Sequence, residues 1–169
     1  AVGQGYYDLA YVINPNDWSN ITLGGVNTWR TTDGGTNWNI SNIWTSSSTY
    51  NTFGSTEIVH ADKHFFAYHP LNANILFECN DGGLFKSPDG GLTWSNITNG
   101  MQISQLYSIS SSQTNSNQIT GGRQDNGSFG IDSGTEIELS GGDGMITHMD
   151  YSDENYIYTS YVEGKIYRY

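Results

Sequence analysis

The sequence predicts an all-β protein made of repeated units, each with four short antiparallel strands. Aromatic and β-branched residues occur in short runs separated by turn residues, and no longer stretch shows an apolar period of about 3.6 residues. One eight-residue phrase also occurs twice, and its two aspartates, Asp33 and Asp89, are separated by about 56 residues. This spacing is within or slightly above the range of β-propeller blades. We therefore expect a β-propeller segment of about four blades, of which the last is incomplete.

The repeated phrase is Ser87-Pro88-Asp89-Gly90-Gly91-Leu92-Thr93-Trp94, and its looser copy is Thr31-Thr32-Asp33-Gly34-Gly35-Thr36-Asn37-Trp38. Glycine adopts the positive φ of a tight turn, an Asp side chain caps nearby backbone amides, and the Trp packs on the hairpin. Turn chemistry accounts for every fixed residue of the phrase. The residues to which we assign this structural role are Thr31, Asp33, Gly35, Trp38, Ser87, Asp89, Gly91, Thr93 and Trp94.

Aligning the chain on the two copies divides it into units. We expect residues 1–169 to be a single partial β-propeller, with blades at about 6–41, 64–98, 105–140 and 145–169 and a long connection at 42–63. The third blade has a degenerate turn at Asp132-Ser133-Gly134, and the fourth lacks its last strand. A propeller closes with about four to eight blades. We therefore expect the segment to associate with the remaining blades of a longer chain or with neighbouring chains.

On these motifs the sequence resembles the BNR/Asp-box propellers, the superfamily shared by sialidases, sortilin-type receptors and xyloglucanase-like glycoside hydrolases. The resemblance covers nearly the whole chain and is strongest to large secreted repeat proteins of the Bacteroidetes type. It implies a secreted or cell-surface location. Sialidase activity requires an arginine triad, whereas Arg30, Arg123 and Arg168 occupy non-equivalent blade positions. The phrases that carry the resemblance are Gly5-Tyr6-Tyr7-Asp8, His60-Ala61-Asp62-Lys63-His64, Asn80-Asp81-Gly82-Gly83, Gln124-Asp125-Asn126-Gly127 and Gly141-Gly142-Asp143-Gly144.

The composition excludes several partners. The chain has 6 Lys and Arg against 17 Asp and Glu, which gives a formal net charge of −11. This charge argues against nucleic acid and anionic membrane surfaces as partners. No apolar run reaches the roughly 18 residues of a membrane span, so we expect no membrane insertion. The single cysteine, Cys79, lies in an apolar strand and is interpreted as a small core residue.

Blade topology predicts where a binding face lies. In an up-and-down blade, the loops between the second and third strands emerge on the same face as the loops between blades, while the Asp-containing turns lie opposite. The expected ligand-binding face therefore contains Gln4, Tyr6, His60, Asp62, Asp81, Arg123, Gln124, Asp125, Asn126 and Asp143.

Two groups of residues in these loops could bind a metal or catalyse a reaction. Alternation in an extended segment would place His60, Asp62 and His64 on one side, where they could hold a divalent metal; the alternative is a hydrogen-bonded structural cluster. The sequence implies no other cofactor. Asp125 and Asp143 are the candidate catalytic residues, since two carboxylates about 5–9.5 Å apart could act as acid and base on a glycosidic bond. Alternatively, the two aspartates only fasten their glycine-rich loops.

Three functions follow from these observations. The first is a noncatalytic platform on a secreted or cell-surface protein that binds a glycan or a protein. The alternatives are a fragment of a xyloglucanase-like glycoside hydrolase and a structural or adhesin repeat region. We favour the binding platform, because it requires only exposed polar loops and aromatic residues, whereas an enzyme requires convergent acids in a cleft.

Overall fold

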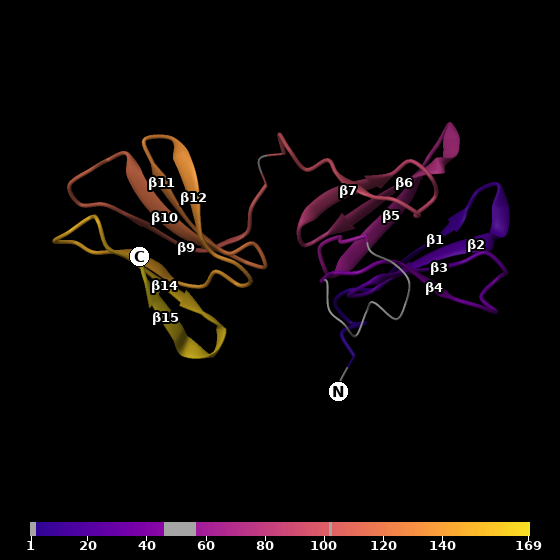
Figure 1. Cartoon of the computed structure of the whole chain (residues 1–169), viewed down its shortest axis with the longest axis horizontal. Helices are drawn as coiled ribbons and strands as arrows, with labels where there is room; N and C mark the ends of the chain where they lie inside the picture. Colours follow the sequence, from indigo (N-terminus) through magenta and orange to yellow (C-terminus); the bar gives the residue numbers. More distant parts are fainter. Residues whose placement is uncertain (1–2, 46–56, 102) are drawn as a thin grey trace. The chain divides into compact units, whose positions relative to one another are not determined.

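The computed structural model describes residues 3–45, 57–101 and 103–169, and it confirms the all-β class. The chain divides into two compact units, Ala1–Met101 (unit 1) and Gln102–Tyr169 (unit 2). Each unit contains two antiparallel sheets in which every strand pairs with the next strand along the chain (Figure 1). In the described ranges, no helix is long and apolar enough to cross a membrane.

Unit 1 contains two four-stranded sheets. The first sheet consists of β1 (Ala10–Asn14), β2 (Asp17–Gly24), β3 (Thr28–Thr31) and β4 (Asn39–Asn42). The second consists of β5 (Lys63–His69), β6 (Asn72–Asn80), β7 (Gly83–Ser87) and β8 (Ser95–Asn96). Residues 46–56 of the expected long connection lie outside the described residues.

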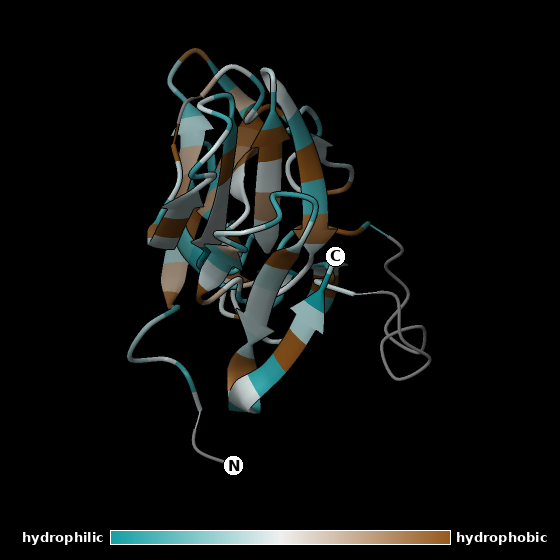
Figure 2. Cartoon of the chain, turned by 90° about the vertical axis from the view of Figure 1, so that its left-hand side faces the viewer, coloured by the Kyte–Doolittle hydropathy of each residue, from teal (hydrophilic) through white to brown (hydrophobic). Residues whose placement is uncertain are grey.

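Unit 2 contains one sheet of four strands and one of three. The first consists of β9 (Leu106–Ser111), β10 (Gln118–Arg123), β11 (Ser128–Asp132) and β12 (Thr135–Ser140). The second consists of β13 (Thr147–Met149), β14 (Ile157–Tyr161) and β15 (Lys165–Arg168), with a single 3₁₀ turn, η2 (Val162–Gly164), before its last strand. Figure 2 shows hydrophobic and hydrophilic residues alternating along the strand that ends near the C-terminus, as expected for strands with two different faces.

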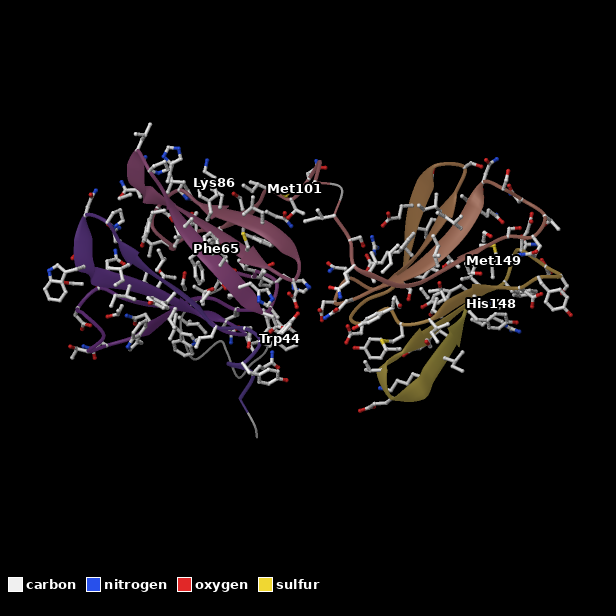
Figure 3. All side chains as sticks on the ribbon, turned by 180° about the vertical axis from the view of Figure 1, so that it is seen from behind. Trp44, Phe65, Lys86, Met101, His148 and Met149 are labelled. Atoms are coloured by element: carbon white, nitrogen blue, oxygen red, sulfur yellow. The ribbon has the colours of Figure 1, made fainter. Side chains whose placement is uncertain are left out.

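The core of unit 1 lies between its two sheets. Ala10 of β1, Phe66 of β5 and Leu76 of β6 are buried together. Val12, Tyr68 and Trp94 pack around them. Figure 3 shows side chains filling the space between these sheets, with Phe65 and Lys86 labelled on the second sheet. Alternation along β1 explains the arrangement, because Ala10 and Val12 point to the second sheet while Tyr11 stays exposed.

The two copies of the repeated phrase form turns with the same hydrogen-bond pattern. Asp33 Oδ1 accepts hydrogen bonds from the Asn37 amide at 2.9 Å and from Thr31 Oγ1 at 2.7 Å. Asp89 Oδ1 accepts the equivalent bonds from the Thr93 amide and Ser87 Oγ, each at 2.8 Å. The hydrogen bonds, that from the Asn37 amide foremost, lower the pKa of Asp33 to about 2.

Glycines and tryptophans complete these turns. Gly35 and Gly91 adopt φ values of 95° and 96°, which residues with a Cβ rarely adopt. The two Trp residues differ in environment. Trp94 donates from Nε1 to Ser41 Oγ at 3.2 Å and packs against the core, whereas Trp38 donates to the Gly35 carbonyl of its own turn at 3.1 Å.

Close backbone packing joins the two sheets of unit 2. Ser108 Oγ on β9 donates to the Met145 carbonyl at 3.0 Å and accepts from the Thr147 amide at 2.9 Å. Beside this contact, a Cβ placed on Gly122 of β10 would lie 1.9 Å from the Met145 carbonyl oxygen. Only glycine fits here, because the neighbouring atoms belong to backbone that cannot rotate away.

Candidate functional site

Three segments of unit 1 converge on a polar cluster. They are the chain before β1, the chain before β5, and the turn between β6 and β7. Gln4 Nε2 donates to Asp62 Oδ1 at 3.0 Å, which joins the first two segments. The Tyr7 hydroxyl donates to Asp81 Oδ2 at 3.0 Å, which joins the first and third. The structure thus brings Gln4, Asp62 and Asp81 of the expected face together.

His64, the second residue of β5, also belongs to this cluster. Its Nε2 lies 2.6 Å from Asp81 Oδ1, and its ring meets the Tyr7 ring edge to face with centroids 4.9 Å apart. The Asp81 carboxylate therefore holds both Tyr7 and His64. Tyr6, which we expected on the binding face, is 90% exposed.

The alternation expected for residues 60–64 is wrong, because Asp62 adopts a φ of 61° and interrupts the extended backbone. His64 then contacts Asp81, Asp62 accepts from Gln4, and His60 Nδ1 lies 3.4 Å from the Ala61 carbonyl oxygen. Asp62 and His64 take part in the polar cluster, whereas the His60 contact is with the carbonyl of the next residue. We assign no metal to them.

A buried ion pair lies directly beneath this cluster. Lys63 Nζ is 3.2 Å from Glu78 Oε1, and both side chains are fully buried. Lys63 Nζ also donates to the carbonyls of Val59 and His60, so it fixes the chain just before Asp62. Burial lowers the pKa of the Lys63 ammonium, while the Glu78 carboxylate acts in the opposite direction.

A second carboxylate, Asp8, lies beside Asp62 but is much more deeply buried. Its side chain and backbone together are only 2% exposed. Gln4 Nε2 lies between the two acids, at 3.0 Å from Asp62 Oδ1 and 3.5 Å from Asp8 Oδ2. Burial, and then the charges of Asp8 and Asp81, raise the pKa of Asp62.

Asp8 also lines an open pocket of about 310 Å³. Polar groups come from Gln4, Asp8 and Asn27, and an apolar wall comes from the strands β2 and β3 and the chain before β1. We call it the Asp8 pocket. Its lining residues are Gln4, Gly5, Asp8, Leu9, Leu23, Gly24, Gly25, Val26, Asn27 and Trp29.

Asp8 was missed in the sequence analysis, which placed only Gln4 and Tyr6 of this segment on the binding face. A signal was present in the sequence. Asp8 precedes Ala10 and Val12 in the same alternation, so it occupies an inward-facing position where a carboxylate is expensive to bury. An ionisable residue at such a position is a good indicator of a site.

The remaining expected site residues lie in unit 2. Asp125 adopts a φ of 56°, and its amide donates to Asp143 Oδ1 at 3.1 Å. Arg123 is 3.0 Å from Glu136, and its guanidinium stacks 4.6 Å from the centre of the Phe129 ring. The Gln124 amide donates to the Gln105 carbonyl at 3.0 Å. These contacts fasten the loop between β10 and β11.

Asn126 belongs to the same loop. Its Nδ2 donates to the Gln124 carbonyl at 3.0 Å, and its own carbonyl accepts from Arg123 Nε at 3.1 Å. The Asp143 carboxylate accepts its hydrogen bond from the Asp125 amide of this loop. This is the contact expected if the two aspartates only hold their loops in place.

No protein-family model matches the sequence, and no curated protein matches it. Solved structures with a similar course of the chain include an ancestral GH74 enzyme, with 13% identity and a TM-score of 0.43 over 94% of this chain and 25% of that one. The GH74 enzyme of Niastella koreensis is 19% identical, with a TM-score of 0.38 over 96% of this chain and 28% of that one. YCF48 from Cyanidioschyzon merolae is 13% identical, with a TM-score of 0.40 over 96% of this chain and 56% of that one. The chain thus spans about a quarter of the GH74 enzymes and about half of YCF48.

Proposed function

We propose that this chain is a segment of a BNR/Asp-box β-propeller and serves as a noncatalytic platform that binds a glycan or a protein. The observation that carries the proposal is the Asp8 pocket, in which a buried carboxylate and two amide side chains face an apolar wall that includes Trp29. A concave site with a few fixed polar groups on an apolar surface is the usual form of a binding site.

The two turns of unit 1 support the repeat type. Asp33 and Asp89 make equivalent hydrogen bonds to a hydroxyl and to a backbone amide four residues further on. In both turns, the hydroxyl of the first residue also accepts a hydrogen bond from the second glycine's amide, at 3.1 Å in one and 2.7 Å in the other. The Asp-box phrases thus act as structural fasteners in this proposal.

The arrangement of carboxylates favours binding over hydrolysis. Glycosidases with two catalytic carboxylates separate them by about 5 Å or more, so that the sugar lies between them. Beside the pocket, the Asp62 carboxyl lies close enough to Asp8 for the Asp8 charge to raise its pKa. In unit 2, Asp143 is occupied by the Asp125 amide. We therefore favour binding over hydrolysis for both groups of carboxylates.

The proposal extends to location and assembly. We place the protein outside the cell or on its surface, in agreement with the acidic composition and the resemblance to secreted repeat proteins. We propose that its propeller is completed by further blades, from a longer chain or from neighbouring chains. Exposed apolar residues on β1 and β9, among them Tyr11 and Ile109, support such coverage.

Binding and hydrolysis can be tested in one experiment. Isothermal titration of the chain with a panel of soluble polysaccharides and polypeptides is run beside an assay for newly formed reducing ends. We expect saturable binding to at least one class and no reducing ends. Trp29→Ala should weaken that binding about tenfold or more, while Trp18→Ala, at a residue that is 77% exposed and outside the pocket lining, should not. Release of reducing ends would refute a noncatalytic role.

A further inference from the structure

We infer that the Asp8 pocket binds a primary ammonium group on an apolar stem, the group that ends a lysine side chain. The inference rests on the proposed function, since it takes this pocket as the binding site and names the class of its ligand. It commits to a lysine-bearing polypeptide as the partner.

The state of the Asp8 carboxylate favours a cationic ligand. Asp8 is buried, and its hydrogen-bond donor in the cluster is Gln4 Nε2 at 3.5 Å, at the outer limit for such a bond. The neighbouring Asp62 carboxyl is itself an acid, and the Asp8 charge raises its pKa. Buried carboxylates are normally matched by charged or short, well-aligned donors. An ammonium group in the pocket would supply that donor.

Lys63, a basic residue whose charge interacts with that of Asp8, forms its ion pair with another acid, Glu78. Lys63 follows Asp62 in the chain, but its ammonium contacts Glu78 and the carbonyls of Val59 and His60. The Asp8 charge is the smallest of the effects that raise the pKa of Lys63. The carboxylates of Asp8, Asp62 and Asp81 therefore form a negative region beside the pocket. A cation bound there would reduce the repulsion among these carboxylates.

The polar groups of the pocket suit an ammonium group better than a sugar. A sugar ring presents several hydroxyls, each of which needs directional partners. Gln4 Nε2 is occupied by Asp62, and Asn27 Oδ1 already accepts from the Trp44 amide at 2.9 Å. An ammonium group needs only acceptors, and Asp8 provides them.

The apolar wall suits the methylene stem of lysine. Leu9, Leu23 and Val26 line the pocket together with the Trp29 ring. Long basic side chains bury their methylene groups along apolar surface while the charged end seeks polar partners. A cation close to an indole ring gains further attraction from its electron-rich face. The net charge of −11 favours approach of cationic segments at low salt.

The experiment is an NMR titration that monitors the tryptophan indole resonances at low salt. The probe is Nα-acetyl-lysine methylamide, and its matched control is the Nα,Nε-diacetyl compound, which keeps the stem but lacks the charge. We expect the lysine probe to shift the Trp29 indole signal saturably while the exposed Trp18 signal stays in place. The diacetyl control should bind at least about tenfold more weakly, as should the probe to Asp8→Asn, whereas Asp17→Asn on β2 should bind as the wild type does.

The outcomes separate the inference from the proposed function. Equal binding of the charged and diacetyl compounds would overturn the inference without depending on the folding of any variant. Saturable binding of methyl β-glucoside at Trp29, with no effect of the lysine probe, would overturn the inference and leave the binding platform standing. If neither compound shifts Trp29 and the polysaccharide and polypeptide panel also fails to bind, both the inference and the proposed function are wrong.

Discussion

Lys63 and Glu78 form an ion pair of 3.2 Å in which both side chains are fully buried. Glu78 Oε2 also accepts from Thr28 Oγ1 at 2.8 Å and from Asn42 Nδ2 at 2.9 Å, two residues of the other sheet of unit 1. The pair therefore joins β3 and β4 to β5 and β6, and it holds the segment that carries Asp62.

Removing one partner should be costly, because the remaining charge would stay buried without its counterion. We expect Lys63→Met to lower the free energy of unfolding by about 3–5 kcal/mol in urea denaturation followed by circular dichroism. The exposed pair Lys165–Glu163, at 3.6 Å, provides the control, and Lys165→Met should cost less than about 1 kcal/mol. A loss at Lys63 no larger than at Lys165 would contradict this role.

In contrast to the Lys63–Glu78 pair, the charge of Asp62 is expected to destabilise the fold. Its pKa is raised in the folded state, so its stabilising effect is complete below the unfolded pKa of about 3.8 and is lost as the pH rises through the folded value. Asp62→Asn removes the charge, and Asn tolerates the positive φ well. We expect the variant to melt roughly 2 °C higher than wild type at pH 7.5 and equally at pH 3. A lower melting temperature at pH 7.5 would show that the Asp62 charge stabilises the fold.

The contribution of Asp33 to stability should depend on pH in the opposite direction to that of Asp62. Its pKa is lowered to about 2 by hydrogen bonds to its carboxylate, so the stability that it contributes is present above about pH 4 and is lost as the pH falls toward 2. Carbonyl NMR of the Asp side chains as a function of pH measures this directly. A midpoint near the ordinary value of 3.8 would mean that the turn is not held as described.

The equivalent turn at Asp89 can be tested by mutation. Asp89 accepts hydrogen bonds from two backbone amides and two hydroxyls, and Asp89→Ala would leave these donors without their shared acceptor. We expect a loss of about 1.5–3 kcal/mol in unfolding free energy, and a smaller loss for Asp89→Asn, which keeps one oxygen in place. If Ala and Asn destabilise equally, the oxygen contacts do not hold the turn.

Two glycines of unit 2 provide a matched pair. A Cβ on Gly122 would lie 1.9 Å from the Met145 carbonyl oxygen, whereas a Cβ on Gly130 of β11 would meet its nearest neighbour at an ordinary 3.5 Å. We expect Gly122→Ala to remove hydrogen-exchange protection from β10 and β13, and Gly130→Ala to leave it intact. Equal protection in both variants would refute the close packing.

The sequence predicted the parts of the fold that depend on local chemistry. Alternation and turn residues located the strands, and the Asp–Gly turns of unit 1 follow from the preference of glycine for positive φ and of carboxylates for backbone amides. The bounds of the strands were harder to predict from the sequence. The last strand of the second sheet contains only Ser95 and Asn96, which pair with Lys86 and Phe85 of β7.

The candidate site was predicted only in part. Gln4, Asp62 and Asp81 were placed on the same face because topology alone brings their loops together. The pairing of His64 with Asp81 was not predictable, because it follows from the positive φ of Asp62, which alternation does not reveal. Asp8 was missed, although it precedes Ala10 and Val12 at an inward-facing position of the same alternation.

The account's central claim is that the Asp8 pocket holds the ammonium end of a lysine side chain. The most direct measurement is of intermolecular nuclear Overhauser effects between Nα-acetyl-lysine methylamide and the protein. We predict contacts from the ε-methylene protons of the probe to the Trp29 indole, and their loss in Asp8→Asn. Contacts to Trp18 in place of Trp29, or contacts at Trp29 that persist unchanged in Asp8→Asn, would contradict the claim.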